Sequence, residues 1–269
     1  MDLNIDYAKK ILGIELTEQE VKNALLKQGL QYEKGKVKIP PYRVDFLHQI
    51  DIVEEIALGY GFEKFQPKIP KISTIGRENE NEVKKRKIAE ILCGLGLIET
   101  CSFHLTNKKV LSKSLISGDF IELENGNEEY NICRPNLISQ QLKILSENTD
   151  SGYPQKIFEL GKIFKKADTE TGAEEPEILS VTLCSAESNF TEIKQVLDYL
   201  MRMLGINYEI KETQNPSFIK GRTGKVLVNG NEIGILGEIH PQIIENFKIK
   251  FPVCAMELNL SNLFDLNNL

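Results

Sequence analysis

The sequence lacks long apolar runs. None of its 269 residues lies in a stretch that approaches the ~20 apolar residues of a membrane-spanning helix. The amino terminus, MDLNIDYAKK, has acidic residues where a secretory signal would have basic residues followed by an apolar core. The sequence also shows no internal repeat and no low-complexity tract. We therefore expect a globular protein of the cytoplasm, with no membrane partner and enough chain for one large domain or two modest ones.

Paired cysteines are lacking as well. The five cysteines are scattered, odd in number and without a C-x-x-C pair, so we expect neither a disulfide framework nor a zinc site. Most of them lie in apolar runs, which favours buried thiols in a reducing compartment. They are Cys93, Cys101, Cys133, Cys184 and Cys254.

An excess of positive charge is lacking, because 39 acidic residues outnumber 33 lysines and arginines. The net charge is −6 and the isoelectric point is about 5.4, whereas nucleic-acid-binding modules usually carry a basic surface. The only dense basic run is Lys84 to Lys87, which we interpret as the solvated face of a helix in preference to a phosphate contact. Any contact with RNA would therefore be shared with another, more basic surface.

Residues 1–68 are predicted to form a compact first domain. A helix over residues 6–12, with Asp6 as its cap, is followed by a T-x-x-E capping box, Thr17 to Glu20, that opens a second helix. Residues 32–39 then form a short hairpin that ends at a pair of prolines. Two short helices joined by a tight turn indicate a helix-turn-helix-like arrangement.

An acidic helix is predicted over residues 48–61, where apolar residues recur at helical spacing. It carries Asp51, Glu54 and Glu55, with Asp45 just upstream, and no lysine or arginine lies within it. Like-charge pairs at this spacing oppose a helix by roughly 0.2–0.5 kcal/mol each. Either the face is fully hydrated, which the residues alone favour, or a hard cation such as Mg²⁺ binds to the carboxylate oxygens.

A linker over residues 69–77, with proline just before it, separates the first domain from a second over residues 78–269. Strand patterns in the second domain follow one another through hairpins and irregular loops, without regular β-α-β alternation. This order favours an α+β fold with helices on an antiparallel sheet. The predicted helices cover residues 78–96, 136–147 and 189–204, with a short one at Pro241. The predicted strands cover 99–106, 120–124, 156–164, 178–185, 208–211 and 253–260, and residues 226–237 are predicted to form a hairpin that turns at Asn229-Gly230.

Groups arranged for catalysis are lacking. His48, His104 and His240 are far apart in sequence, and none has the spacing of a nucleophile or metal motif. The run Gly221 to Gly224 has neither the lysine nor the spacing of a phosphate-binding P-loop. Arg134 and Arg222 are interpreted as partners in ion pairs or as contacts to a tRNA backbone. The sequence does not choose between these two roles.

Two segments, Val37 to Phe62 and Phe218 to Phe247, resemble the carboxy-terminal part of the β subunit of archaeal and eukaryotic phenylalanyl-tRNA synthetases. The first contains R-x-D followed by D-x-x-E-E and is similar to the family's B5 domain, a small helix-turn-helix or winged-helix-like unit. The resemblance implies that four acids bind Mg²⁺ at an interface shared with the α subunit. The matching residues are Arg43 for the arginine and Asp45, Asp51, Glu54 and Glu55 for the four acids.

The second domain resembles, fragment by fragment and in the same order, the family's class II aminoacyl-tRNA synthetase-like domain. Active class II subunits bind ATP with arginines, because a planar guanidinium grips phosphate at two points. Here KIFELGKIF offers only lysines, and Ile239 and His240 stand where a second arginine is expected. The likeness therefore implies a class II scaffold that is catalytically silent.

The function implied by this resemblance is structural. The chain would be a non-catalytic portion of the β subunit of phenylalanine–tRNA ligase, and so part of an enzyme. The α subunit would bind ATP and phenylalanine in an (αβ)2 heterotetramer that charges tRNA-Phe. Domains that precede B5 in the family, including an editing domain, are not matched, so we expect no editing activity. The alternatives are a free-standing nucleic-acid-binding module and, more weakly, a metal-dependent hydrolase that uses the four acids.

Overall fold

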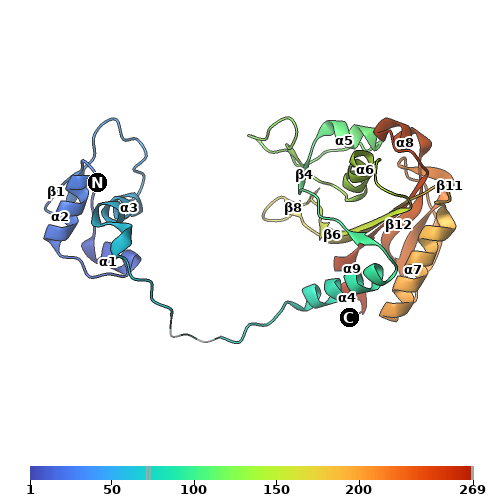
Figure 1. Ribbon diagram of the computed structural model, residues 1–269, viewed down its shortest axis with the longest axis horizontal. Coiled ribbons are helices and arrows are strands. Elements are labelled where there is room, and N and C mark those ends of the chain that lie inside the picture. Colours follow the sequence, from blue (N-terminus) through green and yellow to red (C-terminus); the bar gives the residue numbers. More distant parts are fainter. Residues whose placement is uncertain (71, 73, 268–269) are drawn as a thin grey trace. The chain divides into compact units, whose positions relative to one another are not determined.

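The computed structural model describes residues 1–70, 72 and 74–267 and contains two compact units, Met1–Ile75 and Gly76–Leu269 (Figure 1). The boundary between the units falls inside the segment 69–77 that was expected to be a linker. The described residues between Phe65 and Asn79 contain no helix or strand. Each unit is described by itself below.

The N-terminal unit contains three helices and a hairpin. The Thr17–Glu20 capping box is present, with the side chain of each residue bonded to the backbone amide of the other. The first helix differs from the prediction at its start, because the side chain of Asn4, not Asp6, accepts the free amides of the first turn. The elements are α1 (Ile5–Leu12), α2 (Glu18–Lys27), β1 (Gln31–Glu33), β2 (Lys36–Lys38), α3 (Gln49–Tyr60) and the 3-10 turn η1 (Phe62–Lys64).

The core of this unit forms where α3 packs on α2. Ile52, Val53 and Ile56 of α3 are buried, whereas Ile50, which the apolar spacing also included, is exposed. At Gly59 the two helices approach so closely that a Cβ atom would collide with the backbone carbonyl of Ala24. The close contact therefore depends on a glycine at this position.

The C-terminal unit is built on one seven-stranded sheet with the order β10-β11-β12-β13-β9-β6-β3. All neighbouring strands are antiparallel except β3 and β6, which are parallel. The predicted α+β class is confirmed, with one parallel pair at an edge of the sheet. The strands are β3 (Ile98–Glu99), β6 (Gln155–Lys162), β9 (Glu177–Cys184), β10 (Glu209–Glu212), β11 (Phe218–Val228), β12 (Asn231–Ile239) and β13 (Val253–Asn259).

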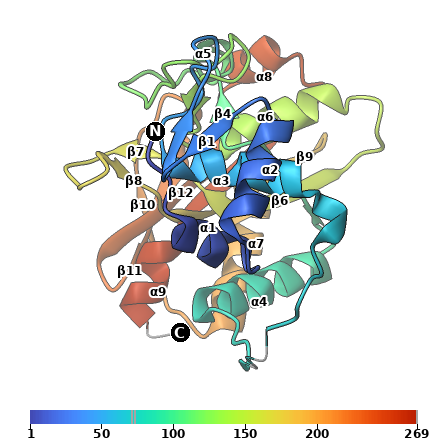
Figure 2. The ribbon, with the colours of Figure 1, turned by 90° about the vertical axis from the view of Figure 1, so that its left-hand side faces the viewer.

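Helices cover both faces of the sheet, as two views agree (Figures 1 and 2). On one face α4 (Glu80–Gly94), α7 (Phe190–Leu204) and α9 (Leu260–Asn267) enclose the larger core. On the other face lie α6 (Ile138–Glu147) and α8 (Pro241–Phe247), with α5 (Lys108–Lys113) packed against them. Because successive side chains of a strand point to opposite faces, each central strand contributes to both cores.

Several elements depart from the prediction. The strand expected over residues 99–106 is divided between β3 and β4 (Leu105–Thr106), which pairs with β5 (Ile132–Cys133) in a separate small sheet. The strand expected over 120–124 is reduced to an isolated bridge between Glu122 and Ile132. A further small hairpin, β7 (Lys165–Lys166) with β8 (Ala173–Glu174), and helix α9 were not predicted.

The cysteines are free thiols, as expected, but they are not all buried. Burial raises the pKa of the Cys184 thiol to about 11 and that of Cys254 to about 12. Cys93 and Cys101 are exposed, so the expectation of buried thiols is wrong for these two. Within the described chain, no helix has both the length and the apolar character needed to cross a membrane.

Candidate functional site

The acidic helix α3 of the N-terminal unit begins with a capping box. Its cap is His48, whose Nδ1 accepts the amide of Ile50 at 3.2 Å. Asp51 completes the box, because its Oδ2 accepts the backbone amides of His48 at 2.8 Å and of Leu47 at 2.7 Å. These two hydrogen bonds, that from His48 first, lower the pKa of Asp51. Asp51 is thus committed to the start of the helix.

Arg43 joins two of the other acids. Its Nη2 lies 2.7 Å from Oδ2 of Asp45 and 2.5 Å from Oε1 of Glu55, and its Nε lies 2.9 Å from Oδ1 of Asp45. The guanidinium also lies over the ring of Phe46, 4.6 Å from the ring centroid. The hydrogen bonds from Arg43 lower the pKa of Asp45. The helix contains no basic residue, but Arg43 supplies one from upstream.

The four acids expected to bind Mg²⁺ are therefore not gathered into one oxygen cluster. Asp45 and Glu55 share Arg43, Asp51 caps the helix, and Glu54 is exposed. Among the described residues there is no group of three or more His, Cys, Asp or Glu side chains arranged to hold a metal ion. In this geometry the acids do not fit a shared cation while Arg43 stays in place. The metal assignment stays a prediction.

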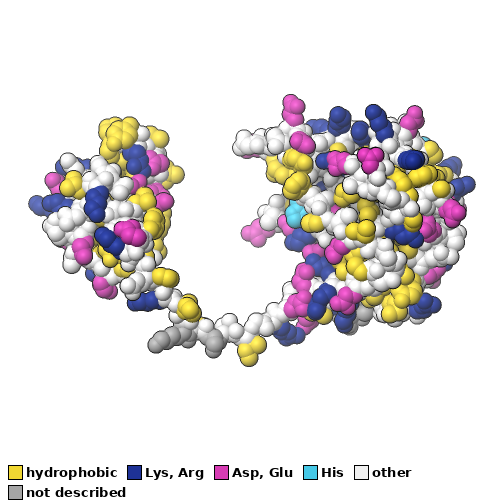
Figure 3. Space-filling view, viewed as in Figure 1, with side chains coloured by type: hydrophobic (Ala, Val, Ile, Leu, Met, Phe, Trp, Pro, Cys, Tyr) yellow, Lys and Arg dark blue, Asp and Glu magenta, His cyan; other side chains and the backbone are white. Residues whose placement is uncertain are grey.

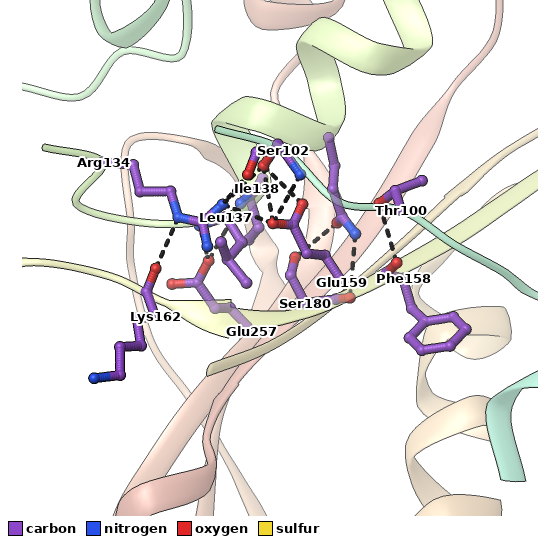
Figure 4. A network of polar contacts seen from close by, with 11 residues as sticks. Thr100, Ser102, Arg134, Leu137, Ile138, Phe158, Glu159, Lys162, Ser180 and Glu257 are labelled. Atoms are coloured by element: carbon purple, nitrogen blue, oxygen red, sulfur yellow. Dashed lines mark hydrogen bonds and ion pairs between the residues drawn. The ribbon is translucent and has the colours of Figure 1, made fainter. Parts of the chain in front are cut away.

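A second polar site lies inside the C-terminal unit. Alternation along the central strands places a strip of polar side chains on the sheet face that α6 covers, among otherwise apolar neighbours. Three of them are buried and Glu257 is partly exposed, and each hydrogen-bonds to a residue of the same unit, as Figure 4 shows for Glu159, Ser180 and Glu257. The strip consists of Glu159 of β6, Ser180 and Thr182 of β9, and Glu257 of β13.

Arg134 closes one end of this strip. Its Nη1 is 2.6 Å from Oε1 of Glu159 and 2.9 Å from Oγ of Ser102, and its Nε donates to the carbonyl oxygen of Lys162 at 2.7 Å. Ser102 in turn donates to both carboxylate oxygens of Glu159. Figure 4 shows these groups converging on the guanidinium. Of the two roles left open for Arg134, the structure shows the ion pair.

Helix α6 closes the rest of the strip. Oε2 of Glu257 accepts the backbone amides of Leu137 and Ile138 at 2.8 and 3.2 Å, so it caps a helix whose own N-cap residue, Leu137, has no side-chain acceptor. Burial raises the pKa of Glu257, and these two hydrogen bonds oppose that shift. Oε1 of Gln141 accepts the hydroxyl groups of Ser180 and Thr182 at 2.7 and 2.5 Å. The hydroxyl groups of Ser180 and Thr182 and one carboxylate oxygen of Glu257 thus find their partners within the chain.

All six arginines of the sequence are engaged with other residues of the chain. Arg222 pairs with Glu238 at 2.6 Å, which gives the ion-pair role to the second arginine left open. The remaining contacts are Arg43 with Asp45 and Glu55, Arg77 with Glu80, Arg86 with Glu78, Arg134 with Glu159, and Arg202 against the ring of Tyr199.

The histidines and the basic run have local roles. His240 caps α8 by accepting the amide of Gln242, and β12 ends one residue earlier. His104 lies edge-on to Phe164. In the basic run, Lys85 is mostly covered and pairs with Glu82 and Glu177, so this position is not the solvated lysine that was expected.

The buried polar strip was missed by the sequence analysis, although a signal existed. Glu159 and Glu257 each stand in a strand of otherwise mainly apolar residues, KIFELGKIF and VCAMELN, where a carboxylate is costly unless it has a partner. An acid at such a position therefore predicts a buried partner. The sequence does not reveal which residue that partner is.

Over 70% of its length the chain has the fold of a class II aminoacyl-tRNA synthetase. The crystal structure of pyrrolysyl-tRNA synthetase from Desulfitobacterium hafniense matches with a TM-score of 0.59 over 70% of this chain and 70% of that one. A second structure of that enzyme matches with a TM-score of 0.58. The sequence identities are 18% and 16%, so this similarity shows the fold alone.

The particular family follows from sequence comparison. A profile described as "Phenylalanyl tRNA synthetase beta chain CLM domain" matches residues 65–260, and one described as "tRNA synthetase B5 domain" matches residues 1–62. The chain belongs to the phenylalanyl-tRNA synthetase β chain family.

Curated relatives agree with this assignment. The phenylalanine–tRNA ligase β subunit of Pyrococcus abyssi is 38% identical over 273 residues, which cover 98% of this chain and 49% of that protein. The β subunit of Archaeoglobus fulgidus is 33% identical over 279 residues, which cover 100% of this chain and 50% of that protein. The chain therefore spans about half the length of the relatives it matches.

Proposed function

We propose that this chain is a non-catalytic, structural part of the β subunit of a phenylalanine–tRNA ligase. In this proposal an α subunit binds ATP and phenylalanine, and the two subunits form an (αβ)2 heterotetramer that charges tRNA-Phe in the cytoplasm. Family membership supports the assignment to the β subunit. The N-terminal unit would be a winged-helix-like docking module, with Mg²⁺ at its acids once Arg43 is displaced.

The proposal of a catalytically silent class II domain depends on the contacts that the arginines make. Adenylate chemistry needs fixed cations at the phosphates, because charge develops there in the transition state. In this chain every guanidinium already has a partner, and that of Arg134 is in a buried ion pair with Glu159. On the sheet face that α6 covers, Ser180 and Thr182 are hydrogen-bonded to Gln141, and Glu257 is hydrogen-bonded to the amides at the start of α6. These contacts support a scaffold without nucleotide chemistry.

The two other hypotheses gain nothing from the comparisons. The relatives reported above are all named as ligase β subunits. None of them is a free-standing nucleic-acid-binding module or a metal-dependent hydrolase. The net charge of −6 also disfavours tight binding to nucleic acid by the chain alone.

The test is co-expression with the α subunit of a phenylalanine–tRNA ligase from the same source. We expect a stable complex by size-exclusion chromatography with light scattering, and ATP–pyrophosphate exchange that depends on phenylalanine only when α is present. Robust exchange by this chain alone would overturn the proposal of a silent domain. Failure to bind α at micromolar concentrations would overturn the proposed partner.

A further inference from the structure

The position of Arg43 bears on where a divalent cation could bind. Mg²⁺ requires carboxylate oxygens at about 2.0–2.1 Å in near-octahedral geometry. The oxygens that would supply this ligation, Oδ2 of Asp45 and Oε1 of Glu55, both face a single nitrogen, Nη2 of Arg43, at 2.7 and 2.5 Å. One cationic group therefore already bridges two of the four expected ligands.

The guanidinium is held at more than one point. Nε donates to both oxygens of Asp45, and the planar group lies over Phe46. The side chain of Glu55 is only 11% exposed, so its charge needs a nearby partner. Removing Arg43 without a replacement would leave a largely buried carboxylate unpaired. The largely buried carboxylate of Glu55 thus already has its counter-charge within the described chain.

We infer that Arg43 is the internal counter-cation of this acidic site, and that a divalent cation and the Arg43 guanidinium are mutually exclusive occupants of it. A cation that bridges Asp45 and Glu55 must first displace Nη2, and the energy of that displacement subtracts from its affinity. The inference departs from the expectation that the four acids alone form a ready metal site. It concerns the chain by itself and does not depend on the α subunit.

The exchange also affects the surrounding loop. Arg43 lies between two exposed apolar residues, Tyr42 at 77% and Val44 at 84%, and Leu47 nearby is 87% exposed. Hydrophobic side chains gather on the surface of this unit in Figure 3. Because Arg43 ties the loop to α3 through Glu55, its displacement removes one of the contacts between loop and helix, while Leu47 stays bonded to Asp51 through its amide. Occupancy by metal and the conformation of the loop are therefore coupled.

The experiment compares divalent-cation binding by the full 269-residue chain and its Arg43→Gln variant. Mn²⁺ binding is followed by the electron paramagnetic resonance signal of the free ion, and Mg²⁺ binding by calorimetry. We expect the variant to bind more tightly by on the order of tenfold, because one competing charge is removed from the ligands themselves. Equal or weaker binding by the variant, including no binding by either protein, overturns the inference.

The matched control is Lys38→Gln, which changes the net charge by the same amount. Lys38 lies on β2, is 63% exposed and pairs with Glu33, so its loss should change Mn²⁺ affinity by no more than about twofold at physiological salt. An equal gain in affinity from Lys38→Gln would show that net charge alone is responsible, and would overturn the inference.

A measurement on the unmodified chain covers the case in which Arg43→Gln does not fold. The Nε–H resonance of Arg43 is followed by nuclear magnetic resonance during a titration with Mg²⁺. We expect it to shift toward that of a free arginine side chain in step with changes in the Asp45 carboxylate signal. An Arg43 resonance that stays unchanged while the Asp45 signal reports metal binding overturns the inference.

Discussion

Arg134 and Glu159 form an ion pair inside the C-terminal unit, with 2.6 Å between Nη1 and Oε1 and only 2% of either side chain exposed. The two residues are 25 positions apart in the chain. The pair fastens the segment that leads into α6 onto strand β6. The position of this segment and the stability of the sheet therefore both depend on the same ion pair.

Loss of one partner from this pair should be severe. We expect Arg134→Met to lower the free energy of unfolding by about 3–5 kcal/mol, because Glu159 would keep a buried charge without a partner. The double variant Arg134→Met with Glu159→Gln should recover part of this loss. Urea denaturation provides the measurement. The control Arg86→Gln, which breaks the exposed pair with Glu78, should cost no more than about 1 kcal/mol.

The cap that Glu257 provides for α6 gives a second prediction. Glu257→Ala should cost about 1–3 kcal/mol, because the amides of Leu137 and Ile138 would be buried without an acceptor. Glu257→Gln keeps a carbonyl oxygen and should cost less. Denaturation curves compare the two variants. If glutamine proves as harmful as alanine, the carboxylate charge and not the hydrogen bonding is what stabilises the start of the helix.

The close approach of α2 and α3 can be tested at one atom. Gly59→Ala should destabilise the N-terminal unit by about 1–3 kcal/mol, because the added methyl group would overlap the carbonyl of Ala24. Gly94→Ala is the matched control, since Gly94 also lies in a helix but has open space around it, and alanine favours helices. Amide hydrogen exchange over residues 18–60 reports the first effect. Unchanged exchange in Gly59→Ala would contradict the packing described.

The thiols should separate into two reactive classes. With a thiol reagent near pH 8 we expect Cys93 and Cys101 to react quickly, and Cys184 and Cys254 only after unfolding, because burial both shields them and raises their pKa. Peptide mapping by mass spectrometry identifies the modified residues. Rapid labelling of Cys254 in the folded chain would be inconsistent with this core.

The same pKa shifts predict how stability depends on alkaline pH. A thiol has a pKa of about 8.5 in the unfolded chain, whereas the folded values are about 11 for Cys184 and about 12 for Cys254. Between these limits the unfolded state binds fewer protons, so stability is full below about pH 8.5 and falls as the pH rises, by up to about 1.4 kcal/mol per pH unit for each thiol. Replacing Cys184 and Cys254 with alanine should flatten this slope.

Local signals in the sequence predicted local structure well. The Thr17–Glu20 capping box and the Asn229-Gly230 turn each depend on residues within a few positions of one another, and both are present. Most of β11, residues 218–225, was missed. A register shift between Phe218 and Thr223, with Gly221 at a φ of +78°, interrupts the alternation by which a strand is recognised.

The functional contacts depend on residues that are distant in sequence. Glu257 caps α6 from 120 positions away, and Gln141 meets Ser180 from 39 positions away, so no pattern within a window could pair them. The acidic helix shows the same limit. The repulsion among its carboxylates was expected to be relieved by water or by a metal ion. In the structure Arg43, twelve positions before Glu55, provides the compensating charge.

Most of the groups that cover the polar strip lie close together in the sequence. Apart from Ser102, the groups that satisfy the strip come from one contiguous stretch, residues 134–141. The strands beneath keep their pairing through backbone bonds that do not involve that stretch. Residues 134–141 therefore close the polar part of this face, while the pairing of the strands beneath does not depend on them.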